Sequence, residues 1–142
     1  MKKIIRIIAA LLIIIALGSF IAWKALMNAP KASAAEKPID ISIAAQTLYQ
    51  EYSADEVAGD KKYISQVIQV KGKITDLYED EQGAPVALLG LDNEDFGGIL
   101  CTFEVNQKEK LSHKTIGDSI IVKGICSGLL MEVVLNRCNL IQ

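Results

Sequence analysis

The chain has 142 residues, of which 51% are hydrophobic, and a formal net charge of −2. The charge is unevenly distributed, because from Asp40 onward sixteen acidic residues stand against nine basic ones, a net charge of −7. An acidic domain repels phosphate backbones, so this distribution argues against a protein that binds nucleic acid through its charge.

The amino-terminal segment is the first predicted element. Three cations, Lys2, Lys3 and Arg6, precede an uninterrupted apolar run that ends at Trp23. As a helix, residues 4–23 would span about 30 Å, the thickness of the hydrocarbon core of a bilayer. An aromatic residue followed by a cation at 23–24 is typical of the membrane interface. We therefore expect residues 1–26 to be a transmembrane signal-anchor with a short cytoplasmic tail.

A cleaved secretory signal is the alternative for the same segment. Ala32-Ser33-Ala34 has the A-x-A form of a cleavage site, but it lies far beyond Trp23, and the apolar run is longer than that of a usual signal peptide. We favour a retained anchor and leave cleavage open. The cations of the tail predict a cytoplasmic amino terminus and an extracytoplasmic domain on a bacterial cell membrane. No cysteine precedes Cys101, so the sequence offers none there for lipid attachment.

The remainder divides into a linker and one domain. Residues 27–39 are small, polar and bounded by prolines, which predicts a linker before a domain at 40–142. Apolar residues at three-to-four spacing predict a helix over 41–52. Ser53, followed three residues later by Glu56, has the form of a capping box and predicts a second helical piece that ends near Tyr63.

After Ser65 the apolar residues alternate, which indicates strands. Gly72 suggests a bulge or bend in the first strand. The longest connection, 106–117, in which we expect one helical turn, separates the third strand from the fourth. The pattern predicts a mainly β fold with amino-terminal helices, a five-stranded OB-like barrel behind a single transmembrane helix. A meander packed on the helices is the alternative. The five predicted strands are 68–74, 85–91, 99–105, 120–126 and 132–141.

Five segments of the domain carry a family resemblance. Residues 48–63, 67–74, 101–105, 117–128 and 133–142 resemble, in order and spacing, the tRNA_anti-like OB-fold family of exported or membrane-anchored bacterial proteins. The most specific is GDSIIVKGICSG at 117–128. The resemblance covers about residues 42–142 and implies an OB fold outside the cytoplasm. The name of the family reflects a distant fold likeness and does not imply tRNA binding.

Nucleic-acid binding is a disfavoured alternative. OB surfaces that bind single strands combine a basic groove with exposed aromatic residues. The strand residues that alternation places outward include no aromatic: they are Gln69, Lys71, Lys73, Thr102, Glu104 and Lys123.

Three cysteines, Cys101, Cys126 and Cys138, lie in the third, fourth and fifth predicted strands. An exported domain meets oxidising conditions, so one disulfide is an expectation whose pairing stays open. Buried free thiols are the equal alternative. A thiol-based redox protein is a second alternative for the function, although the sequence has no C-x-x-C motif and no cation crowds these thiols.

No catalytic, cofactor-binding or metal-binding residue is predicted. Asp92, Glu94 and Asp95 share one turn but lack the register of a calcium loop. His113 is the only histidine and lies in a polar connection, which limits zinc sites and histidine-dependent catalysis. We expect a non-enzymatic, membrane-anchored binding module without a cofactor, whose partner is an envelope protein, a peptide or a glycan. The oligomeric state is left open.

Overall fold

The computed structural model describes residues 15, 18–20, 22–24, 33–91 and 97–142. The chain forms two compact units, Met1–Lys31 and Ala32–Gln142. In the first unit the described residues are helical, and the rest of the predicted anchor at 4–23 lies outside the described residues. Among the residues described, no helix is long and apolar enough to cross a membrane. The anchor stays a prediction.

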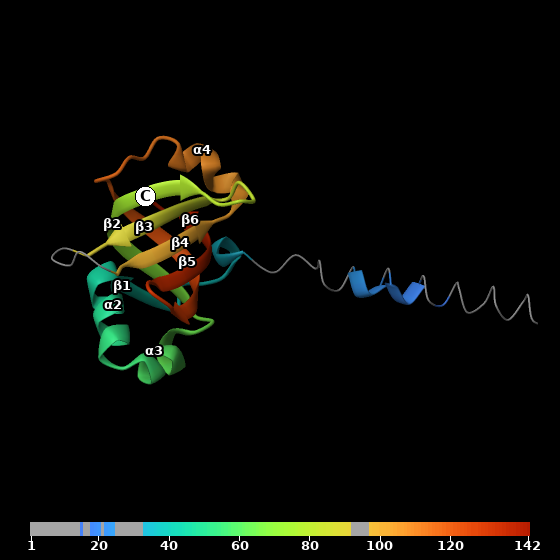
Figure 1. The fold of residues 1–142 in the computed structure, drawn as a ribbon, viewed down its shortest axis with the longest axis horizontal. Helices are drawn as coiled ribbons and strands as arrows, with labels where there is room; N and C mark the ends of the chain where they lie inside the picture. The colour runs from blue at the N-terminus through green and yellow to red at the C-terminus, as the bar shows by residue number, and fades with distance from the viewer. Residues whose placement is uncertain (1–14, 16–17, 21, 25–32, 92–96) are drawn as a thin grey trace, which may run out of the picture. The chain divides into compact units, whose positions relative to one another are not determined.

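The second unit is a β-barrel with helices (Figure 1). Its strands are hydrogen-bonded in the order β1-β2-β3-β4-β6-β5, and a further pairing between β2 and β5 closes the barrel. The β1–β2 and β4–β6 pairs are parallel and the others antiparallel. Strands β2 to β6 form the predicted OB-like barrel, and the position of β6 between β4 and β5 excludes the meander. The strands are β1 (Ile41–Ala44), β2 (Val67–Glu79), β3 (Pro85–Gly90), β4 (Ile99–Phe103), β5 (Ser119–Leu129) and β6 (Val133–Leu140).

The helical region differs from the prediction at its start. Residues 41–44 form strand β1 instead of the first helical turn, because they pair in parallel with Ile68 to Lys71 of β2. Helix α2 follows (Ala45–Ala54), and α3 is Glu56–Tyr63. The predicted capping box is also wrong: Asp55 caps α3, and its Oδ1 accepts the N–H of Ala58 at 3.0 Å.

Strand β2 is longer than predicted, and its irregularity lies elsewhere. The register stays regular through Gly72 and shifts between Ile74 and Asp76. The glycine serves packing, since a Cβ at residue 72 would lie 2.9 Å from the Leu89 Cβ and 3.0 Å from the Ala45 Cβ. The shift changes which residues of β2 point inward, so that Leu77 continues the inward row after Ile74.

The connection from β4 to β5 carries short helical pieces, as predicted. The 3₁₀ helix η2 (Val105–Gln107) leads into α4 (Lys108–Leu111), whose Leu111 is buried. Val105 was expected on the inward face of the third strand, but it begins η2 and is 60% exposed. Strand β4 therefore ends at Phe103, before its predicted end.

Helices α2 and α3 pack on the barrel through two tyrosines. The Tyr52 and Tyr63 rings are buried, with their centroids 5.7 Å apart. The Tyr52 hydroxyl lies 3.4 Å from the Sγ of Cys126 in β5. The Tyr63 hydroxyl donates to Glu51, which also pairs with Lys62 at 2.6 Å. These tyrosines thus anchor the helical pair on the barrel.

Residues 33–37, which we call the strap, pack against the barrel although prediction placed them in a linker. The strap contains η1 (Ala34–Glu36), and the Ala34 side chain is fully buried. It contacts β5 and β6. The Nδ2 of Asn139 donates to Ser33 Oγ at 3.1 Å. Lys123, predicted to face outward, is only 8% exposed, because its ammonium donates to main-chain carbonyls of the strap.

A candidate ligand-binding face

One outward side of the barrel is largely apolar. It is formed by the second half of β2 together with β3, β4 and β6, whose intervening residues point into the core. One row across the strands runs through Asp76, Leu88, Leu100 and Val134, and the neighbouring row through Tyr78, Val86 and Thr102. We call these seven residues the outer face.

Tyr78 is the aromatic side chain that the prediction missed on this face. It is 47% exposed and pairs with Val86, which is itself only 3% exposed. The premise that no outward strand residue is aromatic was therefore wrong. The cause is the register shift between Ile74 and Asp76, which turns Tyr78 outward. The break in alternation along the sequence after Ile74 was the available signal.

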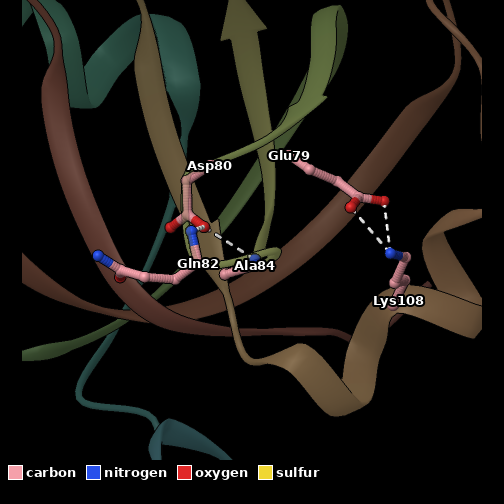
Figure 2. Close-up of polar contacts among 5 residues, drawn as sticks. All are labelled: Glu79, Asp80, Gln82, Ala84 and Lys108. Atoms are coloured by element: carbon pink, nitrogen blue, oxygen red, sulfur yellow. Dashed lines mark hydrogen bonds and ion pairs between the residues drawn. The ribbon is translucent and has the colours of Figure 1, made fainter.

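The β2–β3 turn bounds one end of the outer face (Figure 2). Asp80 folds this turn, because its Oδ1 accepts the N–H groups of Gln82 at 2.9 Å and Ala84 at 2.8 Å. Next to it, Glu79 forms an ion pair with Lys108 of α4 at 2.8 Å. Exposed pairs of this kind contribute only about 0–1 kcal/mol, so this pair orients the turn against α4 without greatly stabilising the fold.

A pocket of about 190 Å³ lies between this end of β2 and α4. Tyr78 belongs both to this pocket and to the outer face. A ligand on the face could therefore extend one group past Tyr78 towards α4. The pocket is lined by Leu77, Tyr78, Glu79, Pro85, Lys108, Leu111 and Ser112.

The β5–β6 turn bounds the opposite end. Its Leu130 and Met131 are 84% and 81% exposed. The turn adjoins the start of β4, because Val133 pairs with Ile99 and donates its N–H to Gly98. In OB folds, oligonucleotides and oligosaccharides bind on the face between the turn that joins the first two barrel strands and the turn that joins the last two. Here these are the β2–β3 and β5–β6 turns. The outer face thus has the position of an OB ligand site.

Acidic residues outnumber basic ones in and beside the segments that build this site. Residues 76–90, 99–104 and 128–136 contain six acidic residues and no lysine, arginine or histidine. The neighbouring cation Lys108 is already paired with Glu79, and Arg137, which follows the last segment, has an interaction partner of its own. The six are Asp76, Glu79, Asp80, Glu81, Glu104 and Glu132.

Of the predicted site residues, the structure brings Cys101 and Cys138 into hydrogen-bonding contact. Cys101, Cys126 and Cys138 are buried free thiols, one of the two alternatives that the sequence left open. Burial, and then a hydrogen bond with Cys101, raise the pKa of the Cys138 thiol well above its ordinary value. Because the thiolate is the reactive form, this argues against a reactive thiol at Cys138.

The remaining candidates are scattered. His113 is exposed in the connection before β5. Thr102 lies on the outer face, whereas Lys71 and Lys73 are exposed on β2 before the register shift. The turn with Asp92, Glu94 and Asp95 lies outside the described residues. In the parts of the chain that the structure describes, no group of three or more His, Cys, Asp or Glu residues is placed to hold a metal ion.

Barrel topology and the placement of the two turns define an OB-fold domain. The family described as tRNA_anti-like matches residues 1–140, and the chain belongs to that family. No curated protein matches the sequence.

Among solved structures the chain is similar to a lipoprotein of Klebsiella pneumoniae subsp. pneumoniae whose name assigns nucleic-acid binding to it. The two share 11% identity over 71% of this chain and 92% of that one, with a TM-score of 0.59. A likeness at this identity concerns the fold. The chain is also similar to the Stn1-Ten1 complex of S. pombe, with 17% identity over 54% of this chain and 58% of that one, and a TM-score of 0.42.

Proposed function

We propose that the protein is a membrane-anchored, extracytoplasmic binding module of the bacterial envelope and that it binds its ligand on the outer face. One observation carries the proposal: an apolar strand surface with the exposed Tyr78 lies between two turns at the OB ligand position. The apolar run that ends at Trp23 supports the anchor. The ligand is an envelope protein, a peptide or a glycan, and no cofactor takes part.

A non-enzymatic role accords with the side chains of the site. Catalysis by a nucleophile needs a base within hydrogen-bond reach. The sole histidine, His113, lies in the connection before β5, and the outer face contributes one carboxylate, Asp76, among apolar and hydroxyl side chains. Such a surface offers a ligand contact area and groups that orient it.

Single-stranded nucleic acid is the second candidate. Tyr78 favours it, because bases stack on exposed aromatic side chains of OB folds. The charge opposes it: the domain carries a net charge of −7 from Asp40 onward, and acidic residues outnumber basic ones around the site. We therefore rank it below a ligand of the envelope.

The test compares ligands and variants of the full chain in nanodiscs of zwitterionic lipid. Envelope glycans, peptides and oligo-dT are titrated at low and moderate salt. Binding of a peptide or glycan that Tyr78→Ala weakens and Val57→Ala does not would support the proposal, since Val57 is exposed on α3, outside the outer face. Tight oligo-dT binding that declines steeply with salt would establish the second candidate instead.

A further inference from the structure

The acidic surroundings of the outer face distinguish among ligands of the envelope. Most cations of the domain lie elsewhere: Lys71 and Lys73 are on β2 before the register shift, and Lys110 and Lys114 are in the connection to β5. Two lie at the site, namely Lys108, which is paired with Glu79, and Arg137 of β6. The six acidic residues of the site therefore outnumber the cations beside it. Such a surface steers cationic ligands towards itself during diffusional encounter, and it repels phosphate and other anionic polymers.

The dimensions of the face fit a polypeptide segment. From β2 through β3 and β4 to β6 there are three strand spacings of about 4.8 Å, so the face is about 14 Å wide. One helix, about 10 Å in diameter, fits this width, as does an extended segment of about four or five residues. The apolar centre, with Leu88, Leu100 and Val134, contacts apolar side chains of a ligand, and Tyr78 offers a ring to an aromatic or guanidinium group.

From this juxtaposition of an apolar centre with a border in which acidic residues outnumber basic ones, we infer that the outer face binds a basic polypeptide segment of a partner protein, one in which lysine or arginine alternates with apolar or aromatic residues. The inference rests on the proposed function, because it assumes that the outer face is the ligand site. The apolar residues of the partner pack on Tyr78 and the centre of the face. Its cations lie beside Glu81 at one turn and Glu132 at the other.

The experiment uses the full chain in nanodiscs of zwitterionic lipid, with empty nanodiscs as a blank. The probes are a short peptide that alternates lysine and tryptophan, its glutamate–tryptophan counterpart, a neutral N-acetylglucosamine oligomer, and oligo-dT. We expect the lysine peptide to bind tightest and to lose about tenfold in affinity with Tyr78→Ala, while Tyr78→Phe retains binding.

Two charge-matched pairs of substitutions test whether the acidic residues beside the outer face attract the lysine peptide. Glu81→Gln with Glu132→Gln removes two charges beside the face, and Glu36→Gln with Glu56→Gln removes two charges from the strap and α3. We expect the first pair to weaken the lysine peptide several-fold and to reduce its salt dependence, and the second to change affinity by less than about twofold. Equal losses with both pairs would mean general attraction to an acidic domain and would overturn the inference.

The remaining outcomes distinguish a failure of this inference from a failure of the proposed function. Tyr78-dependent binding of the glucosamine oligomer or the glutamate peptide, in place of the lysine peptide, would overturn the inference and leave the outer face as the site. Tyr78-dependent binding of oligo-dT would replace it with the nucleic-acid candidate. If Tyr78→Ala weakened no probe, while circular dichroism showed that the variant is folded, the outer face would not be the site and both proposals would fail.

Discussion

Lys123 of β5 and Ala35 of the strap are joined by a hydrogen bond in which the Nζ of Lys123 donates to the Ala35 carbonyl at 3.2 Å. The same ammonium donates to the Lys37 carbonyl. Lys123 pairs in the sheet with Asn139, which holds Ser33, so two adjacent strands bind the strap together. A buried ammonium is costly unless it is hydrogen-bonded, and the strap supplies the acceptors.

Replacement of Lys123 by methionine should destabilise the domain by about 1–3 kcal/mol, since it removes charge-assisted hydrogen bonds and frees two strap carbonyls. Lys71→Met, at an exposed position of β2, is the matched control and should have little effect. Urea denaturation of the full chain gives the free energy of unfolding. Equal stability of the two variants would show that the strap contributes nothing through Lys123.

Removal of the strap should also lower the stability of the domain. A fragment of residues 32–142 keeps the strap, whereas one of residues 38–142 lacks it and leaves Lys123 without those acceptors. We expect the shorter fragment to unfold at a lower urea concentration, with a loss of about 1–3 kcal/mol or more, because the buried Ala34 is also removed. Coincident urea transitions would contradict this.

Alanine at Gly124 should destabilise the barrel through overpacking. A Cβ there would lie 2.6 Å from the Cys138 Sγ and 3.1 Å from the Leu135 Cβ. Overpacking of a core costs about 1–3 kcal/mol. Ser119→Ala, at an exposed position of the same strand, is the control. In the double variant with Cys138→Ala, the loss should be smaller than the sum of the single losses, and simple additivity would locate the strain elsewhere.

Alkaline pH should destabilise the domain. Burial raises the pKa of the Cys138 thiol, and burial followed by its contact with Cys126 raises the pKa of Tyr52. A raised pKa stabilises the fold at pH values below the pKa of the unfolded group, about 8.5 for cysteine, and this contribution is lost as the pH rises further. Urea titrations should therefore give a free energy of unfolding that falls above about pH 8.5. Cys138→Ala should reduce the slope, and an unchanged slope would exclude that thiol as a cause.

Thiol labelling should separate the folded from the unfolded chain. Cys101, Cys126 and Cys138 are at most 2% exposed, so a maleimide should react with none of them in native protein and with all three in denaturant. Mass spectrometry counts the added groups. Fast labelling of native protein would contradict the burial, and fewer than three labels in denaturant without reductant would reveal a disulfide in the purified chain.

The fold could be predicted because the alternation of strands β2 to β6 and the long connection before β5 are local in sequence. The family resemblance is confirmed by the match over residues 1–140. Strand β1 was missed because Ile41 to Ala44 are held by a parallel partner on β2, which no local pattern records. Asp55, and not Ser53, caps α3, because helix α2 continues past Ser53 to Ala54.

The candidate site was harder to predict. A single register shift in β2 moved Tyr78 to the outer face and removed one of the two grounds against nucleic-acid binding, the absence of an outward aromatic residue. The burial of Lys123 depends on the main chain of residues far away in the sequence, so alternation placed it outward. The acidic character of the site could have been read from the sequence, had the segments that border the face been known.

The central place of β6 determines when this domain can fold. Strand β6 lies between β4 and β5 and pairs with both of them. Its parallel pairing with β4 and its hairpin with β5 both require residues beyond Val133. A chain still emerging during synthesis therefore exposes two unpaired strand edges until residues 133–140 are released. Truncations near the carboxyl terminus should yield aggregation-prone chains, because open edges pair readily with other molecules.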